Sequence, residues 1–206
     1  MFLRCSQKFL TELRLKKSDL IEPLNVLHPF DEWYGHVFFL YPRRKCAIFM
    51  HAQTGFCFFA FDRSRDQLND INGLFRKCLG RALFEEHYPA AVIKLFNERL
   101  ENVQVGRTVD RRVISQINQR LLELGYAPEH NAYDQLMNNE SLAGLCLRRI
   151  ATLKDFRRPI ERMRDILIAL NEFKSVEIPS AKDEHPLLEA YFETVRRERS
   201  VNSFRQ

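Results

Sequence analysis

Several common signatures of catalysis are missing from this sequence of 206 residues. It contains no G-x-x-x-x-G-K-[ST] loop, no G-x-G-x-x-G, no H-E-x-x-H and no G-x-S-x-G. Only 7 glycines are available to build loops that cradle phosphates. These absences argue against nucleotide-driven mechanisms and against the familiar classes of hydrolase.

Disulfide and membrane signals are also lacking. The 5 cysteines form no C-x-x-C pair, and their odd number and wide spacing favour reduced, buried thiols. No apolar run approaches the ~20 residues needed to cross a bilayer, and MFLRCSQKFL has polar residues where a signal peptide is hydrophobic. We therefore expect a cytoplasmic protein with no membrane partner. The sequence indicates no cofactor, no metal site and no particular oligomeric state.

The residues that are present describe an ordinary globular chain with an unusual core. Hydrophobic residues make up 45% and charged residues 29%, which favours a folded domain over disorder. There are 17 phenylalanines and 1 tryptophan, and many rings crowd between Phe30 and Phe61. The net charge of +5 allows an acidic partner such as nucleic acid, although many unrelated proteins are equally basic.

Strand signals dominate the first third of the chain. FLRC at 2–5 reads as a short strand, after which Ser6 is placed to cap a helix. From 35 to 61, three runs rich in Phe, Val and Ile are separated by turn-like pieces, which predicts an antiparallel meander. Two of the runs are continuously apolar, so we expect helices to cover both faces of the sheet.

Helical signals dominate the rest. Apolar residues spaced by three and four predict helices over 66–86 and 89–100, and a short strand is expected at 103–106 before the next helix. Shorter helices follow near 133–138 and 141–150, then one that starts at Pro159 and one over about 186–197. We expect an α+β fold with a small, mostly antiparallel sheet packed by helices and a helical C-terminal portion. The predicted division is one α+β domain over 1–175, with its sheet mainly in 1–61 and near 102–106 and its helices after 65, and a helical extension over 176–206.

The stretch GRTVDRRVISQINQRL at 106–121 is the first candidate site. Helical spacing places Arg111, Ser115 and Asn118 on a stripe beside the apolar one, so Asn118 is expected at the edge of the core. In a functional interpretation Arg111 and Asn118 line a polar pocket with Thr108 or Asp110 at the helix start. In a structural interpretation Thr108 or Asp110 merely caps the helix and Asn118 bonds a loop.

A basic turn and two histidines form the second candidate. Arg43, Arg44 and Lys45 stand between two predicted strands, where they could grip phosphate or simply be solvated. His36 and His51 lie on neighbouring strands and could serve as a general acid or base. Two histidines without a third ligand are a weak metal signal.

The third candidate is a basic segment between residues 141 and 165. Its positive charge could attract RNA, DNA or an acidic protein surface, yet its spacing matches no known nucleic-acid-binding signature. A solvated face is the alternative. The basic residues are Arg148, Arg149, Lys154, Arg157, Arg158, Arg162 and Arg164, with Phe156 among them.

Three motifs resemble those of a family of uncharacterised bacterial and archaeal proteins known only as a domain of unknown function. MFLRCSQKFL is similar to the family's M-x-[LI]-R-C-[ST]-[QK]-K-L-L start. WYGHVFFLYPRRKCAIFMHAQTGFCFF resembles its W-[YH]-x-[HN]-x-[FL] segment, which an R-[RK]-K turn and a strand follow. GRTVDRRVISQIN is similar to K-T-N-D-R-S-[VI]-x-x-x-[ML]-N. The resemblance runs from Met1 to about Leu170.

The resemblance implies an intracellular α+β domain of prokaryotic or phage type, with no established activity. Val109 and Arg112 replace the motif's Asn and Ser, which argues against chemistry at that motif. The positions that match the motifs are Arg4, Lys8, Trp33, His36, Arg43, Arg44, Lys45, Thr108, Asp110, Arg111 and Asn118.

Three functions follow as hypotheses. The leading one is a non-enzymatic binding or regulatory module that engages nucleic acid or an acidic protein partner through its basic surface. The second is a nucleic-acid-processing enzyme such as a toxin-like ribonuclease, with His36, His51 or Asp110 at its centre and Arg111 or Lys8 stabilising phosphate charge. The third is a structural subunit of a larger assembly.

Overall fold

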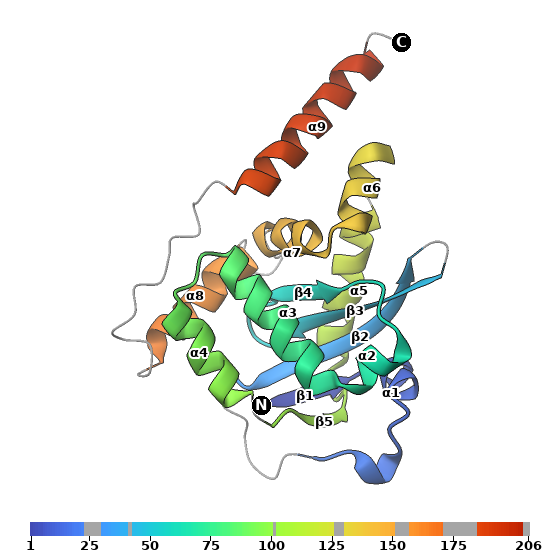
Figure 1. The fold of residues 1–206 in the computed structure, drawn as a ribbon, viewed down its shortest axis with the longest axis vertical. Coiled ribbons are helices and arrows are strands. Elements are labelled where there is room, and N and C mark those ends of the chain that lie inside the picture. The colour runs from blue at the N-terminus through green and yellow to red at the C-terminus, as the bar shows by residue number, and fades with distance from the viewer. Residues whose placement is uncertain are drawn as a thin grey trace.

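A five-stranded sheet forms the centre of the protein (Figure 1). The computed structural model describes residues 1–22, 30–40, 43–100, 102–125, 130–150, 157–170 and 185–203. The strands lie in the order β4-β3-β2-β1-β5. They are β1 (Phe2–Cys5), β2 (Glu32–Leu40), β3 (Arg44–His51), β4 (Cys57–Ala60) and β5 (Gln104–Arg107).

The sheet combines two kinds of pairing. β2, β3 and β4 pair antiparallel, which confirms the predicted meander. β1 pairs in parallel with both β2 and β5. Two of the four pairings are therefore parallel, so the sheet is mixed, and a strand of 4 residues joins its two parts.

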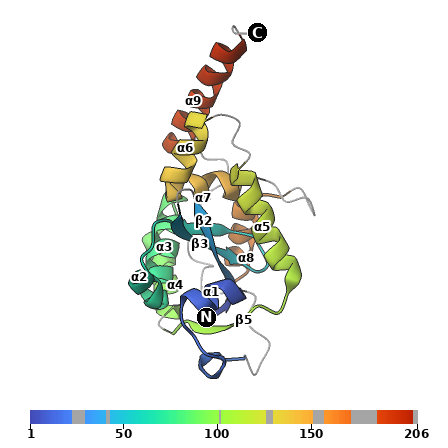
Figure 2. The same cartoon turned by 90° about the vertical axis from the view of Figure 1, so that its right-hand side faces the viewer.

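Helices cover both faces of the sheet, as expected (Figure 2). One face packs on α1 (Gln7–Glu12), α2 (Arg65–Asn69), α3 (Ile71–Glu85), α4 (Ala90–Arg99) and α8 (Pro159–Ala169). The other face packs on α5 (Arg111–Gly125), α6 (His130–Asn138), α7 (Glu140–Arg149) and α9 (Pro186–Ser203). Alternation along β2 explains the two cores, because Trp33 and Val37 point into the first and Tyr34 into the second.

Aromatic rings fill the first core. Trp33 packs edge-on against Phe75 with ring centroids 5.4 Å apart, and Phe49 stacks on Phe58 at 5.2 Å. Gly35 leaves room for the ring of Phe9, since a Cβ there would lie 2.8 Å from a ring carbon. The crowding of Phe along the meander thus produces a dense ring cluster, as the composition indicated.

Some helix boundaries differ from the predicted ones. The single helix expected over 66–86 is two helices, because Asp70 ends α2 and its carboxylate accepts the Gly73 N–H that begins α3. A short 3-10 helix, Lys17–Asp19, precedes a segment in which the Ile21 N–H donates to the Val105 carbonyl and covers the outer edge of β5. α8 begins at Pro159 and α9 at Pro186, as predicted.

Two helices of the C-terminal third, α6 and α9, extend away from the sheet, whereas α7 and α8 pack on it. α6 and α9 project from the same end of the molecule (Figure 1). Among the described helices, none is long and apolar enough to span a membrane. The predicted division at residue 175 lies outside the described residues.

Candidate functional site

Three residues from different motifs meet where the parallel pairing ends, at the carboxyl ends of β1 and β5 and within β2. Gly35, Cys5 and Arg107 lie side by side in the last paired row of β2, β1 and β5. The next residue along each chain is His36, Ser6 or Thr108, and adjacent strands are about 4.8 Å apart. We call these three residues the carboxyl-end row.

His36 and Ser6 are joined directly. The His36 Nδ1 atom lies 2.9 Å from the Ser6 Oγ, and the same Oγ accepts the Phe9 N–H at 3.3 Å as the cap of α1. The predicted capping role of Ser6 is confirmed. Burial, and then the nearby Lys8 cation, lower the pKa of His36 below its ordinary value. A neutral imidazole that accepts from Ser6 at Nδ1 carries its proton on Nε2, which has no partner among the described residues.

Thr108 ends the row beside the start of α5. Its backbone N–H donates to the Cys5 carbonyl at 3.2 Å, but its buried Oγ1 has no hydrogen-bond partner in the described part of the chain. The Asp110 carboxylate accepts the Arg112 N–H at 2.8 Å, and this bond lowers the pKa of Asp110. Asp110 therefore caps α5, as the structural interpretation predicted, and its carboxylate binds a backbone N–H of the first turn.

Tyr34 and Arg4 contact the backbone on either side of Thr108. The Asp110 N–H bonds the hydroxyl of Tyr34, whose burial raises its pKa to about 12. Arg4 is 7% exposed; it bonds the Glu32 carboxylate and donates to the Arg107 carbonyl at 3.2 Å. Arg4 is thus held by the protein itself rather than offered to a ligand.

Lys8 is the predicted cation that stands closest to the row. Its side chain is exposed, its Nζ lies 4.7 Å from the centre of the Phe39 ring, and its charge acts on His36. Arg111, the first residue of α5, is also exposed and makes no ion pair among the described residues. Both cations keep their charge available for an outside group.

The basic turn does not join this site. Arg44 bonds the Asp62 carboxylate and the Asn138 side chain, and the Lys45 Nζ lies 2.5 Å from Glu12. Arg43 is exposed in the left-handed region at φ 85°, and Pro42 lies outside the described residues. Two of the three predicted cations therefore stabilise the hairpin that carries them.

Two further candidates have different surroundings from those expected. Asn118 is exposed on α5 rather than placed at the core edge, because the buried residues of this helix are Val113, Ile117, Arg120 and Leu124. His51 is 0% exposed, its Nδ1 lies 2.9 Å from the Thr54 Oγ1, and its ring packs on Trp33. The whole His51 residue lacks accessible surface and its ring packs against Trp33 and Phe30, so His51 belongs to the core.

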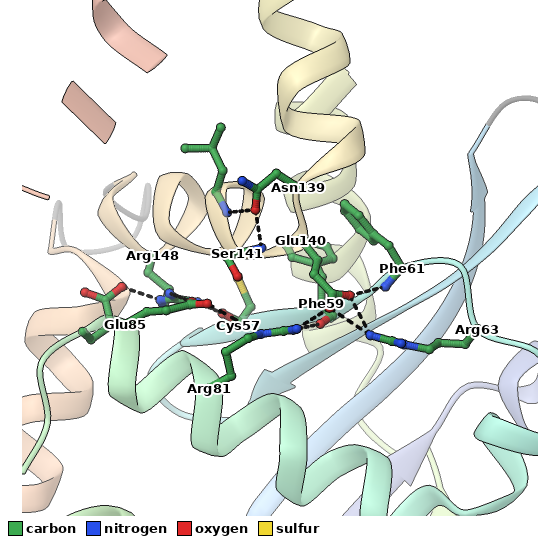
Figure 3. Close-up of polar contacts among 12 residues, drawn as sticks. Cys57, Phe59, Phe61, Arg63, Arg81, Glu85, Asn139, Glu140, Ser141 and Arg148 are labelled. Carbon is green, nitrogen blue, oxygen red and sulfur yellow. Dashed lines mark hydrogen bonds and ion pairs between the residues drawn. The ribbon is translucent and has the colours of Figure 1, made fainter. Parts of the chain in front are cut away.

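Arg148 corrects the prediction of a basic surface over 148–164. It is 1% exposed, and its guanidinium donates to the Glu86 carboxylate at 2.6 Å and to the Cys57 carbonyl at 2.9 Å (Figure 3). Arg149 lies 2.8 Å from the second oxygen of Glu86. Neither arginine forms part of an open basic face.

This buried network seals the outer edge of β4. The groups that point away from β3 belong to alternate residues, and three of them are met by charged side chains of α3 or α7 (Figure 3). Arg148 meets the Cys57 carbonyl, Arg81 the Phe59 carbonyl at 3.0 Å, and Glu140 the Phe61 N–H at 2.5 Å. Charged groups thus take the place of a sixth strand and prevent pairing with another chain.

The remaining members of the predicted patch lie on α8 and before it. Arg157 bonds the Asp165 carboxylate, and Arg158 bonds Glu161 at 2.7 Å. Lys154 and Phe156 lie outside the described residues. Arg157 and Arg158 therefore face carboxylates of their own chain.

The roles of Ser6 and Glu86 were not predicted from the sequence. Ser6 was predicted only as a cap, since nothing indicated that β1 pairs in parallel with β2 and brings His36 to it. Glu86 reads as one acid among many at the end of a helix. The described residues contain no group of three His, Cys, Asp or Glu side chains that could hold a metal ion.

Fold and site together define an α+β domain with a mixed sheet covered on both faces and a partly satisfied polar row at the carboxyl ends of its parallel strands. The family model of a domain of unknown function, DUF6933, matches residues 2–162, and the chain belongs to this family. The family-level resemblance is thereby confirmed, while its three motifs and its prokaryotic origin stay predictions. A search of curated proteins found no match.

Proposed function

We propose that this domain is a binding module whose ligand presents a phosphate or a similar anionic group to the carboxyl-end row. The observation that carries the proposal is the pair of unsatisfied donors there. The Thr108 hydroxyl is buried and has no hydrogen-bond partner among the described residues, and the His36 ring, which bonds Ser6 through Nδ1, has no partner there at Nε2. Thr108 directly follows β5, and His36 lies within β2 just past the last residue that pairs with β1. Buried polar groups normally find partners, so donors without one favour an outside acceptor.

Charge and location support an anion over a neutral acceptor. Lys8 and Arg111 flank the row, and neither makes an ion pair in the described structure. α5, a helix of 15 residues, begins next to Thr108, and helix starts favour negative charge. In sheets with parallel strands, ligands bind outside the carboxyl ends of the strands.

Nucleic acid is the phosphate ligand to test first, because the net charge of +5 favours polyanions. Fluorescence anisotropy of a labelled single-stranded RNA would be measured against protein concentration at two salt concentrations. His36→Ala and Thr108→Val should each weaken binding by about tenfold, as expected for one hydrogen bond to a charged group. Asn118→Ala, on the exposed face of α5, is the matched control and should bind like the unsubstituted protein.

Equal loss in all three variants, or none in any, would contradict this location of the site. Competition by inorganic phosphate then separates a site for a single phosphate from an extended surface. If the association constant did not change with salt concentration, phosphate contacts would be excluded.

A second candidate is a nucleic-acid-processing enzyme. The lowered pKa of His36 keeps its imidazole neutral near pH 7, and its position beside Lys8 would let it move a proton near a phosphate. Time-dependent cleavage of the RNA that His36→Ala abolishes would favour this function. Stable binding without product would favour the module.

A further inference from the structure

The C-terminal helix begins at a histidine that acts as its cap. His185 precedes α9, its Nδ1 accepts the Leu187 N–H at 3.2 Å, and its carbonyl accepts the Leu188 N–H at 2.8 Å. An imidazole nitrogen accepts a hydrogen bond only when it carries no proton. The first turn of α9 is therefore built for neutral His185.

This turn attaches α9 to the body of the protein. Leu188, Tyr191 and Val195 follow at helical spacing and are buried in the second core with Leu136 and Met137 of α6. Beyond these contacts the helix projects away from the sheet (Figure 1). α9 also lies outside the residues matched by the family model, which end at 162.

Positive charge already surrounds the His185 ring. The ring is 8% exposed and lies on that of His87, with centroids 5.7 Å apart and an interplanar angle of 30°. His87 ends α3 in the left-handed region at φ 59°. From α7, Arg149 acts on His185 as a further cation.

The nearby carboxylates have other partners. Glu86 of the α3 end lies between Arg148 and Arg149, and Glu85 pairs with Arg148 at 3.4 Å. On α9 itself, Glu189 is exposed in the first turn. A proton on His185 would thus add charge beside Glu85 and Glu86, which already pair with arginines.

We propose that His185 is a pH-sensitive latch that holds α9 against α6 and α7 when it is neutral and releases it when it is protonated. Protonation removes the Nδ1 acceptor from the Leu187 N–H and puts a cation at a helix N-terminus, where the helix dipole disfavours it. It also adds repulsion from Arg149 and from His87, both of which disfavour the charged form of His185. Release uncovers the apolar surface of Leu136 and Met137.

The direction of the pH effect follows from the same contacts. Burial, and then Arg149, lower the pKa of docked His185 below its ordinary value of 6.5, against the opposing pull of Glu86. A group with a lowered pKa binds its proton more readily once released. Docking is therefore complete above pH 6.5 and weakens as the pH falls from there through the lowered pKa of the docked form.

Hydrogen exchange of the full chain tests the latch, with the protection of each peptide corrected for the intrinsic rate at each pH. Protection of 186–195 should fall between about pH 7.5 and about pH 5, while peptides of β2 and β3 keep theirs. His185→Asn is the matched control, because Asn caps helices but does not titrate. In that variant the protection of 186–195 should not change with pH.

A second substitution distinguishes release caused by the charges around His185 from a general loss of stability at low pH. His87→Asn keeps a residue that tolerates positive φ and removes one charge, so it should reduce the fall in protection without abolishing it. The proposal is overturned if the unsubstituted protein keeps its α9 protection at about pH 5. It is equally overturned if His185→Asn loses protection to the same extent.

Discussion

Two polar regions of this protein contrast in how fully their groups are paired. At the β4 edge, Arg148, Glu86 and Glu140 reach one another or the backbone, and the strand's outer groups are met by charged side chains. At the carboxyl-end row, His36 and Thr108 keep groups without a partner among the described residues.

The β4 edge is not fully satisfied, because the Arg63 Nε and Glu86 Oε2 atoms lack a hydrogen-bond partner among the described residues, although the Glu86 Oε2 lies 2.8 Å from Arg149. The two regions differ in degree: ion pairs hold the charged groups of the β4 edge, whereas Lys8 and Arg111 beside the row make no ion pair in the described structure.

The largest expected effect comes from breaking the ion pairs of the β4 edge. Arg148→Met leaves Glu86 buried with one partner fewer and the Cys57 carbonyl unmet, which should lower the free energy of unfolding by about 3–5 kcal/mol. Arg157→Gln, in an exposed pair with Asp165, should change it by about 1 kcal/mol or less. Urea unfolding measures both, and equal losses would contradict the structural role of Arg148.

Crowding beneath the row is the next test. A Cβ on Gly106 would lie 2.6 Å from the Ile21 carbonyl oxygen, so Gly106→Ala should destabilise the protein by about 1–3 kcal/mol. On α3 a Cβ on Gly80 would meet only Ile93, at 3.9 Å. Gly80→Ala should therefore stabilise the protein by roughly 0.5–1 kcal/mol through helix propensity. Thermal unfolding of the two variants should shift in opposite directions, and a shared direction would argue against the crowding at Gly106.

The cap of α1 links stability to the row. Ser6→Ala removes the acceptor of the Phe9 N–H and should lower the free energy of unfolding by about 1 kcal/mol. Ser115→Ala, on the exposed face of α5, should stay within about 0.5 kcal/mol of the unsubstituted protein. If chemical denaturation gives the two variants the same stability, Ser6 does not cap α1 in solution.

The smallest effect is a shift in one titration. Lys8 disfavours the charged form of His36, so Lys8→Met should raise the pKa of His36 toward its ordinary value while burial continues to hold it down. Arg43→Met, in the hairpin turn, should leave it unchanged. NMR titration of the histidine ring protons measures both variants. An unchanged pKa in Lys8→Met would place the lysine away from the row.

Much of the fold could be predicted because local patterns determine it. The Phe-rich runs of β2, β3 and β4 are joined by short turns, so their antiparallel pairing follows from the sequence. The pairing of β1 with β5 joins residues about a hundred positions apart, and no local pattern encodes it. The row was missed for the same reason, because Ser6 meets His36 through the parallel pairing of β1 with β2 and meets Thr108 through that of β1 with β5.

Charge was harder to interpret than pattern. Arg148 and Arg157 look alike in sequence, yet Arg148 of α7 is buried against Glu86 and Arg157 is exposed beside Asp165. Helical spacing predicted the general burial of α5 but not its precise rotation, and so placed Asn118 too near the core. Which acid faces which base depends on tertiary packing, and that is where the predicted basic surface failed.

The most direct test of the contrast is an NMR titration of the full chain with inorganic phosphate near neutral pH, followed through the backbone amides. We predict saturable shifts confined to Ser6, Lys8, His36 and residues 108–111, with none at Arg157 or Arg158. Shifts centred on Arg157 and Arg158 or on the Arg43–Lys45 turn, or no saturable shift at millimolar phosphate, would contradict the assignment of the carboxyl-end row as the binding site.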